Sequence, residues 1–269
     1  MLIAKSGDFF TDFSVDMYED TSASMSYKQI KEIKEFSPHS NRISEGYSSS
    51  HFWYKFKIRN ATDSKLNYFI KFTENIAHEV DCYIVSSSGE YVKYREGVGT
   101  FSKNSLNELK KPEFIIDLNV GESKTVYLRI FGIYANFTSF NIFDAKSLDK
   151  YTLKYEKVYS LFFGTIIALL LYNLVIYFYS RDSSYLYYVL YGSSFLSWQL
   201  LLNGFPPFDT FSSTSTFYLA GISIPIMITF IIFFTRAILD TKKLFPKIDK
   251  AIKFIYYLHL VLYSLDKNL

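Results

Sequence analysis

The side chains best suited to chemistry in this sequence lie around Trp53. Trp53, Lys55 and Lys57 occupy alternate positions, so in an extended strand they share one face. An indole flanked by cations can stack on a sugar ring and hold its hydroxyl or acid groups. Arg129, which follows Tyr127 by two residues in a later stretch, offers the same chemistry. The candidate ligand-binding residues are therefore Trp53, Lys55, Lys57 and Arg129.

The same pattern also has a purely structural interpretation. Trp53 would then cover the domain with a second packed layer, and the neighbouring cations would be solvated surface groups. The sequence favours this structural interpretation, because charged side chains on a strand face are usually exposed to solvent.

Catalytic and metal-binding patterns do not occur in the sequence. His39, His51 and His78 lack the spacing of metal ligands, and there is no nucleophile elbow or glycine-rich phosphate loop. Cys82 is the single cysteine, so the chain forms no internal disulfide, and its alternating surroundings predict a buried strand position. The net charge of +3 and the absence of a long Lys/Arg run argue against nucleic acid as a partner. We expect no enzymatic activity and no cofactor.

Short alternating stretches dominate residues 1–150. The clearest is 52–58, and Ser26 is expected to cap a short surface helix. Further strands are predicted at 66–72, 80–85, 114–118, 125–131 and 139–143. Many short strands with almost no helix between them indicate an antiparallel β-sandwich, and we expect a jelly-roll-like topology.

Long apolar stretches take over in residues 151–269. No charged side chain occurs from Val158 to Tyr179, and a helix over these residues reaches roughly 33 Å, enough to cross the ~30 Å hydrocarbon core of a bilayer. Further spans are predicted at about 185–202, 217–235 and 254–265, the last of which is too short for a complete span. This part is therefore expected to be a partial, multi-span α-helical membrane domain.

Polar side chains are scarce within these predicted spans. They contain no Asp, Glu, Lys or Arg, which argues against an ion-coupled transporter or an intramembrane protease. Asn173 is expected to form a hydrogen bond between helices, and Gly164, Gly192 and Gly221 are expected to permit close helix packing.

The charges of the connections predict an orientation. Residues 203–216 contain no Lys or Arg, whereas the next connection contains Arg236, Lys242, Lys243, Lys247, Lys250 and Lys253. The positive-inside rule places the second connection in the cytoplasm and therefore the amino-terminal domain outside it. Lys150, Lys154 and Lys157 oppose this assignment and are outweighed by the contrast between the two connections. Because the first residues hold no signal peptide and the last predicted span is incomplete, we expect the chain to be a fragment of a longer protein.

Two stretches of the membrane part resemble a known family. Residues 164–173 fit the pattern G-x-x-x-A-L-x-x-Y-N with Gly164, Tyr172 and Asn173, and the following turn fits R-D-x-x-Y-L-x-Y with Arg181, Asp182 and Tyr185. Both patterns resemble the bacterial 7TM-DISM receptors, seven-transmembrane receptors with diverse intracellular signalling modules. Residues 52–60, 80–84 and 126–130 resemble strands of the extracellular sandwich of that family.

The resemblance implies a function that the residues alone do not. It implies a periplasmic sensor for carbohydrates or related small molecules, seven spans in the bacterial inner membrane, and a cytoplasmic histidine kinase or diguanylate cyclase module. The sequence shows neither the later spans nor an output signature, so this module would act in cis beyond the chain or in trans. Whether the chain forms a homodimer is open. The alternative is a membrane-anchored envelope-binding protein that sends no signal.

Overall fold

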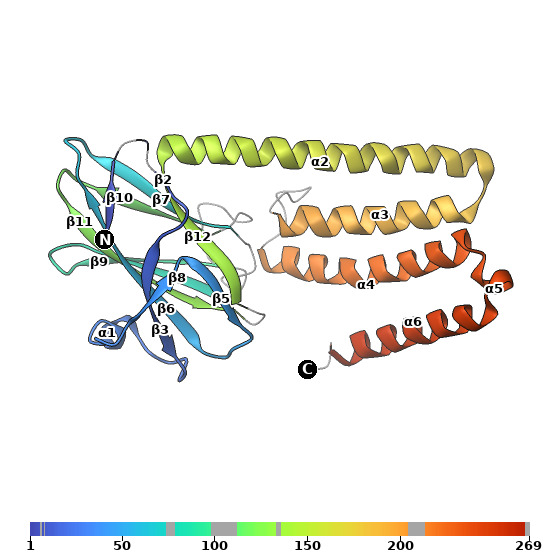
Figure 1. Cartoon of the computed structure of the whole chain (residues 1–269), viewed down its shortest axis with the longest axis horizontal. Coiled ribbons are helices and arrows are strands. Elements are labelled where there is room, and N and C mark those ends of the chain that lie inside the picture. The colour runs from blue at the N-terminus through green and yellow to red at the C-terminus, as the bar shows by residue number, and fades with distance from the viewer. Residues whose placement is uncertain are drawn as a thin grey trace. The chain divides into compact units, whose positions relative to one another are not determined.

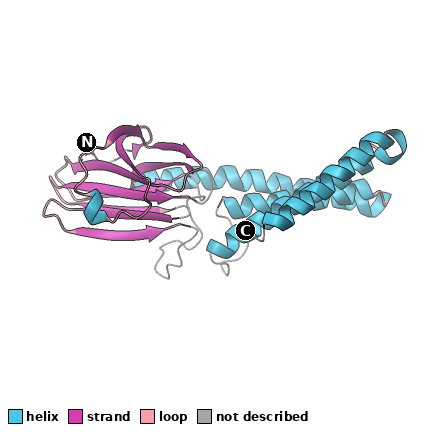
Figure 2. Cartoon of the chain, turned by 90° about the horizontal axis from the view of Figure 1, so that it is seen from below, coloured by secondary structure: helices cyan, strands magenta, loops and turns pink. Residues whose placement is uncertain are grey.

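The computed structural model describes residues 1–5, 7, 9–73, 79–97, 112–132, 136–203 and 213–266 (Figure 1). The described residues form two compact units, which we call the sandwich unit (up to Lys154) and the membrane unit (from Tyr155). Strands make up most of the first unit and helices the second, as Figure 2 shows.

The larger sheet of the sandwich unit has the strand order β4-β3-β6-β11-β8-β9, and β1 pairs in parallel with β6. These strands are β1 (Leu2–Ala4), β3 (Ser14–Asp20), β4 (Ser37–Ser40), β6 (His51–Asn60), β8 (Glu79–Val85), β9 (Tyr91–Glu96) and β11 (Ser123–Phe131). Neighbouring strands in this order all pair antiparallel. Strand β9 is therefore an edge strand.

The smaller sheet has the order β10-β7-β12-β2, and β5 also pairs with β12. Its strands are β2 (Phe9–Phe10), β5 (Arg42–Gly46), β7 (Leu66–Phe72), β10 (Glu113–Leu118) and β12 (Asn136–Asp144). Each strand predicted from alternation lies in an observed strand, and the β-sandwich followed by helices is confirmed. The short strands β1 to β5 and the edge strand β9 were not predicted.

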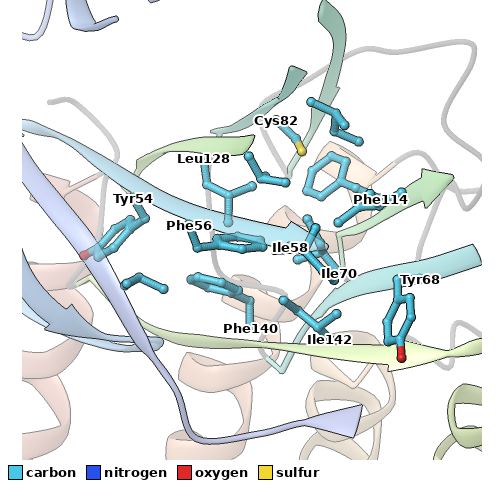
Figure 3. Close-up of a cluster of buried hydrophobic side chains, with 14 of the residues drawn as sticks. Tyr54, Phe56, Ile58, Tyr68, Ile70, Cys82, Phe114, Leu128, Phe140 and Ile142 are labelled. Carbon is cyan, nitrogen blue, oxygen red and sulfur yellow. The ribbon is translucent and has the colours of Figure 1, made fainter. Parts of the chain in front are cut away.

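Alternation builds the main core between the two sheets. Phe56 of β6 and Phe140 of β12 stack with ring centroids 5.9 Å apart, and Ile58 and Ile70 are fully buried nearby (Figure 3). Cys82 also points into this core, so its predicted buried strand position is confirmed (Figure 3).

A second, smaller core lies on the opposite face of the larger sheet. Helix α1 (Tyr27–Ile30) and the residues around it cover Trp53, Tyr83 and Tyr127 there. The expected cap is present, because the backbone N–H of Ser26 donates to Gln29 Oε1 at 2.8 Å. This layer closes much of the face on which the ligand-binding residues were predicted.

Five elements follow the sandwich: α2 (Ala145–Ser180), α3 (Ser183–Leu202), α4 (Ser213–Ile238), α5 (Thr241–Leu244) and α6 (Pro246–Asp266). Among the described residues, two helices are long and apolar enough to cross a membrane, Ala145–Ser180 and Tyr218–Ile238. The spans expected at 185–202 and 254–265 are helical in α3 and α6 but are not among these two, so they stay predictions.

Candidate functional site

Trp53 has no exposed surface in the structure. Its ring packs against Tyr83, with centroids 5.8 Å apart and planes 28° from parallel, and Tyr27 and Ile30 belong to the same cluster. A ligand therefore has no access to the indole face in this arrangement. The structure places Trp53 in a second packed layer, as the structural interpretation of the sequence described.

The two lysines beside Trp53 differ in their surroundings. The Lys55 ammonium lies over the rings of Phe36 and Tyr127, 5.0 and 5.6 Å from their centroids. Such cation–π contacts bind the lysine into the aromatic layer. Lys57, two residues further along β6, is exposed to solvent. The predicted set thus does not form one open surface.

Arg129 belongs to a cluster of charges around the buried carboxylate of Asp81. Its guanidinium lies 2.7 Å from Asp81 and 3.3 Å from Glu79, while Arg95 donates two hydrogen bonds to Asp81 at 2.6 and 3.0 Å and Lys93 lies 3.3 Å away. Burial raises the pKa of Asp81, but the hydrogen bond from Arg95 and the neighbouring cations outweigh this effect and hold the pKa below its ordinary value. Asp81 is therefore an ionised centre at neutral pH, around which cations are arranged.

His51 lies at the end of this charged row. Burial lowers its pKa and the charge of Arg129 adds to the effect, while Asp20 and Glu79 act in the opposite direction. His51 Nδ1, Trp53 Nε1 and Arg129 Nε have no hydrogen-bond partner among the described residues. Neutral His51 is thus the favoured form inside the cluster.

The other two histidines considered in the sequence, His39 and His78, are not seen in a metal site. His39 Nε2 lies 3.0 Å from Glu45, and His78 lies outside the described residues. No group of three His, Cys, Asp or Glu side chains in the described part of the chain is placed to hold a metal ion.

A groove of about 640 Å³ opens where edge strand β9 faces edge strand β10. Val92 and Tyr94 of β9 line it together with Ile115 of β10, and Glu90 and Asp117 provide carboxylates. Sequence reasoning did not find this groove. The alternation of Tyr91–Glu96 could have indicated β9, but its position opposite β10 depends on pairings that are distant in the sequence.

The Arg181-Asp182 pair forms the turn between α2 and α3. Arg181 has a left-handed backbone with φ 57°, and its N–H donates to the carbonyl of Tyr177 at 2.8 Å, which ends α2. Asp182 accepts a hydrogen bond from the N–H of Ser184 at 2.9 Å, which caps α3. Arg181 and Asp182 build the connection, and Tyr185 follows in the first turn of α3.

The first-span motif makes fewer contacts than expected. Asn173 donates to the carbonyl of Leu169 in its own helix at 2.8 Å, and the hydrogen bond between helices expected of it stays a prediction. Tyr172 is 64% exposed, and a Cβ on Gly164 would meet nothing within 4 Å.

Gly192 of α3 does permit close packing. A Cβ there would lie only 2.5 Å from Leu170 Cδ2 of α2, whereas the position of Gly221 is open like that of Gly164. Of the three glycines expected to permit close packing, Gly192 alone has a neighbour at this distance.

Several solved structures show a slight likeness to the sandwich. They include an exo-β-1,3-galactanase from Phanerochaete chrysosporium (7% identity, TM-score 0.25, 52% of this chain and 29% of that one) and a family 35 carbohydrate-binding module from Clostridium thermocellum (8%, 0.26, 52% and 100%). Another is the C-terminal CBM6 of a laminarinase from Zobellia galactanivorans (11%, 0.21, 49% and 99%). These likenesses are too slight to bear on the ligand of this chain.

Family models match both parts of the chain, although no curated protein matches it. Residues 13–144 match the 7TMR-DISM extracellular 2 domain, and residues 155–266 match the domain described as 7TM diverse intracellular signalling. Both are domains of sensory receptors rather than of enzymes. The resemblance seen in the motifs around Asn173 and Arg181 is thereby confirmed, and the chain belongs to the 7TM-DISM family of membrane receptors.

Proposed function

We propose that this chain is the sensory portion of a signal-transduction protein of the bacterial inner membrane. The sandwich unit binds a small molecule, of which a carbohydrate is the leading class, on the outer side of the membrane. The helices cross the membrane several times and relay binding to a cytoplasmic histidine kinase or diguanylate cyclase module in cis or in trans.

The continuity of β12 and α2 is the observation that supports a relay. Asp144 ends β12, and its carboxylate accepts hydrogen bonds from the N–H of Ser147 in the first turn of α2 and from the N–H of Gly7, each at 2.9 Å. Tyr151 of α2 packs against Phe143 of β12 with ring centroids 4.9 Å apart. The first turns of the helix thus belong to the sandwich unit, while the same helix continues as an apolar span. A displacement of β12 on binding passes into α2, provided that the ligand prefers one of two states.

The orientation can be tested with single cysteines, because the native Cys82 is buried. Lys57 and Lys242 are both exposed, one in the sandwich and one in the basic connection before α6. A membrane-impermeant maleimide should label Lys57→Cys in intact spheroplasts. It should label Lys242→Cys only after the spheroplasts are lysed. The reverse pattern would refute a sandwich outside the cytoplasm.

The ligand-binding roles of Trp53, Lys55, Lys57 and Arg129 stay predictions. Lys57→Ala is the informative variant, because its side chain is exposed and its loss leaves the aromatic layer intact. Trp53→Ala would remove a fully buried ring at a cost of about 3–5 kcal/mol, so reduced binding could reflect unfolding alone.

The output can be tested in the DNA on both sides of the reading frame. An in-frame or adjacent kinase or cyclase is expected for a receptor. Their absence, together with binding to an envelope component, would favour a membrane-anchored binding protein that sends no signal.

A further inference from the structure

We infer that the groove between β9 and β10 is the ligand site of the sandwich, and that it takes a polyhydroxylated ring without negative charge. The inference rests on the proposed sensory function, for which it supplies the site. The volume of about 640 Å³ falls within the range of roughly 300–1,000 Å³ typical of small-molecule sites.

One end of the groove offers an apolar platform. Val92 and Tyr94 alternate on edge strand β9 and are 53% and 39% exposed, while the charged Lys93 and Arg95 of this strand contact Asp81. Tyr94 packs with its ring centroid 6.4 Å from that of Phe114, a fully buried core residue, so its position is supported from below. The apolar face of a sugar ring stacks on a surface of this kind.

The other end of the groove offers hydrogen-bonding groups. Glu90, which directly precedes β9, and Asp117 of β10 are exposed carboxylates, and hydroxyl or ammonium groups of a ligand can donate to them. Among the described lining residues the one cation is Lys124, which lies 3.7 Å from Glu122, so its charge is already countered. The described lining is therefore negative overall, which disfavours a ligand that carries a carboxylate.

The groove and the Trp53 face differ in access. Trp53 is covered by the segment around α1, and Arg129 is engaged by Asp81 and Glu79. In the groove, the side chains suited to stacking and to hydrogen bonding are both open to solvent. A ligand can reach them without displacing an element of the described structure.

The full chain in lipid nanodiscs provides the test, with saturation-transfer NMR as a readout for weak binding. The probes are glucose, galactose and mannose, each with its amino-sugar and uronic-acid form. We expect at least one neutral or amino sugar to bind and its uronic acid to bind at least about tenfold more weakly.

Two variants and two matched controls locate the binding. Tyr94→Ala and Asp117→Asn should each raise the dissociation constant of the bound sugar by about tenfold or more. Tyr47→Ala removes a tyrosine that is 84% exposed, and Asp63→Asn removes an exposed carboxylate outside the groove, so neither should change binding. Unchanged melting temperatures in Asp117→Asn and Asp63→Asn show that the fold is kept.

The inference is overturned if no sugar binds, if uronic acids bind best, or if Tyr94→Ala and Asp117→Asn bind like the wild type. Sugar binding that is lost in Lys57→Ala and kept in both groove variants would return the site to the Trp53 face and leave the sensory function intact. The cysteine-labelling experiment tests the receptor topology separately, so the failure of the groove and that of the proposed function are distinguishable.

Discussion

Asp81 shows how a buried charge shapes the outer face of the larger sheet. Its side chain is 1% exposed, and Arg95, Arg129 and Lys93 surround it within 3.3 Å. A carboxylate in such a place is tolerated only because its partners replace the solvent it has lost. Removing it would leave Arg129, whose side chain is 15% exposed, without its closest counter-charge.

We therefore expect Asp81→Ala to lower the free energy of unfolding by about 3–5 kcal/mol, the usual cost of breaking a buried ion pair from one side. Chemical unfolding of the full chain, followed by tryptophan fluorescence, measures the change. Asp63→Ala is the matched control on an exposed carboxylate and should cost less than about 0.5 kcal/mol. Equal effects in the two variants would show that the charge cluster contributes little.

His51 predicts a dependence of stability on pH. Its pKa is lowered in the folded protein by burial and by Arg129, so the unfolded chain, with a histidine pKa of about 6.5, binds more protons. Stability should therefore fall as the pH is lowered from about 7 through 6.5 towards the depressed value. The carboxylates Asp20 and Asp81, whose pKa values are also lowered, act only at more acidic pH.

Melting temperatures of the wild type and His51→Gln between pH 7.5 and 5 check this. Glutamine stays neutral, so the melting temperature of the variant should depend less steeply on pH between 7.5 and 5 than that of the wild type. An identical slope in both proteins would contradict the assignment.

Single residues also show what alternation can and cannot predict. It places Cys82 and Phe56 in the core, since side chains two apart share a face. It also places Trp53 on the opposite face. Alternation does not predict that the segment around Ile30 folds back over that face, because this contact joins parts of the chain that are far apart in the sequence.

At the scale of elements, α2 and α3 approach each other closely at Gly192. Gly192 leaves room for Leu170, whereas Gly164 has open space around it. A larger side chain at Gly192 must push the two helices apart or move Leu170.

Gly192→Leu should therefore lower the melting temperature of the chain in detergent by several degrees, the effect of about 1–3 kcal/mol of overpacking. Gly164→Leu, the matched control in α2, should leave it unchanged or raise it slightly, because leucine favours helices more than glycine. A larger loss in Gly164→Leu would contradict the packing seen here.

The sequence predicts elements best where they are long and periodic. Strand β6 and helix α2 are found at their expected places for this reason. Strand β9 lies at a sheet edge with both faces partly exposed, so its signal is weak. The groove against β10 could not be predicted, because it results from the order of strands in two sheets rather than from one segment.

At the scale of the whole molecule, the sandwich carries its own core. The main cluster extends from Ala4 to Ile142, and the second cluster lies within the same part of the chain. Neither cluster contains a residue of the membrane unit. The chain passes from the sandwich unit into the membrane unit within α2, after Lys154.

A protease site inserted between Lys154 and Tyr155 tests this division. After cleavage, the sandwich should leave the membrane in soluble form and melt cooperatively within about 2–4 °C of its temperature in the intact chain, since a domain with its own core folds alone. Aggregation of the released part, or a broad transition, would show that its stability depends on the membrane unit. A sandwich that is stable alone and continues directly into α2 suits a relay, because this helix is then a path by which binding outside can reach the cytoplasmic side.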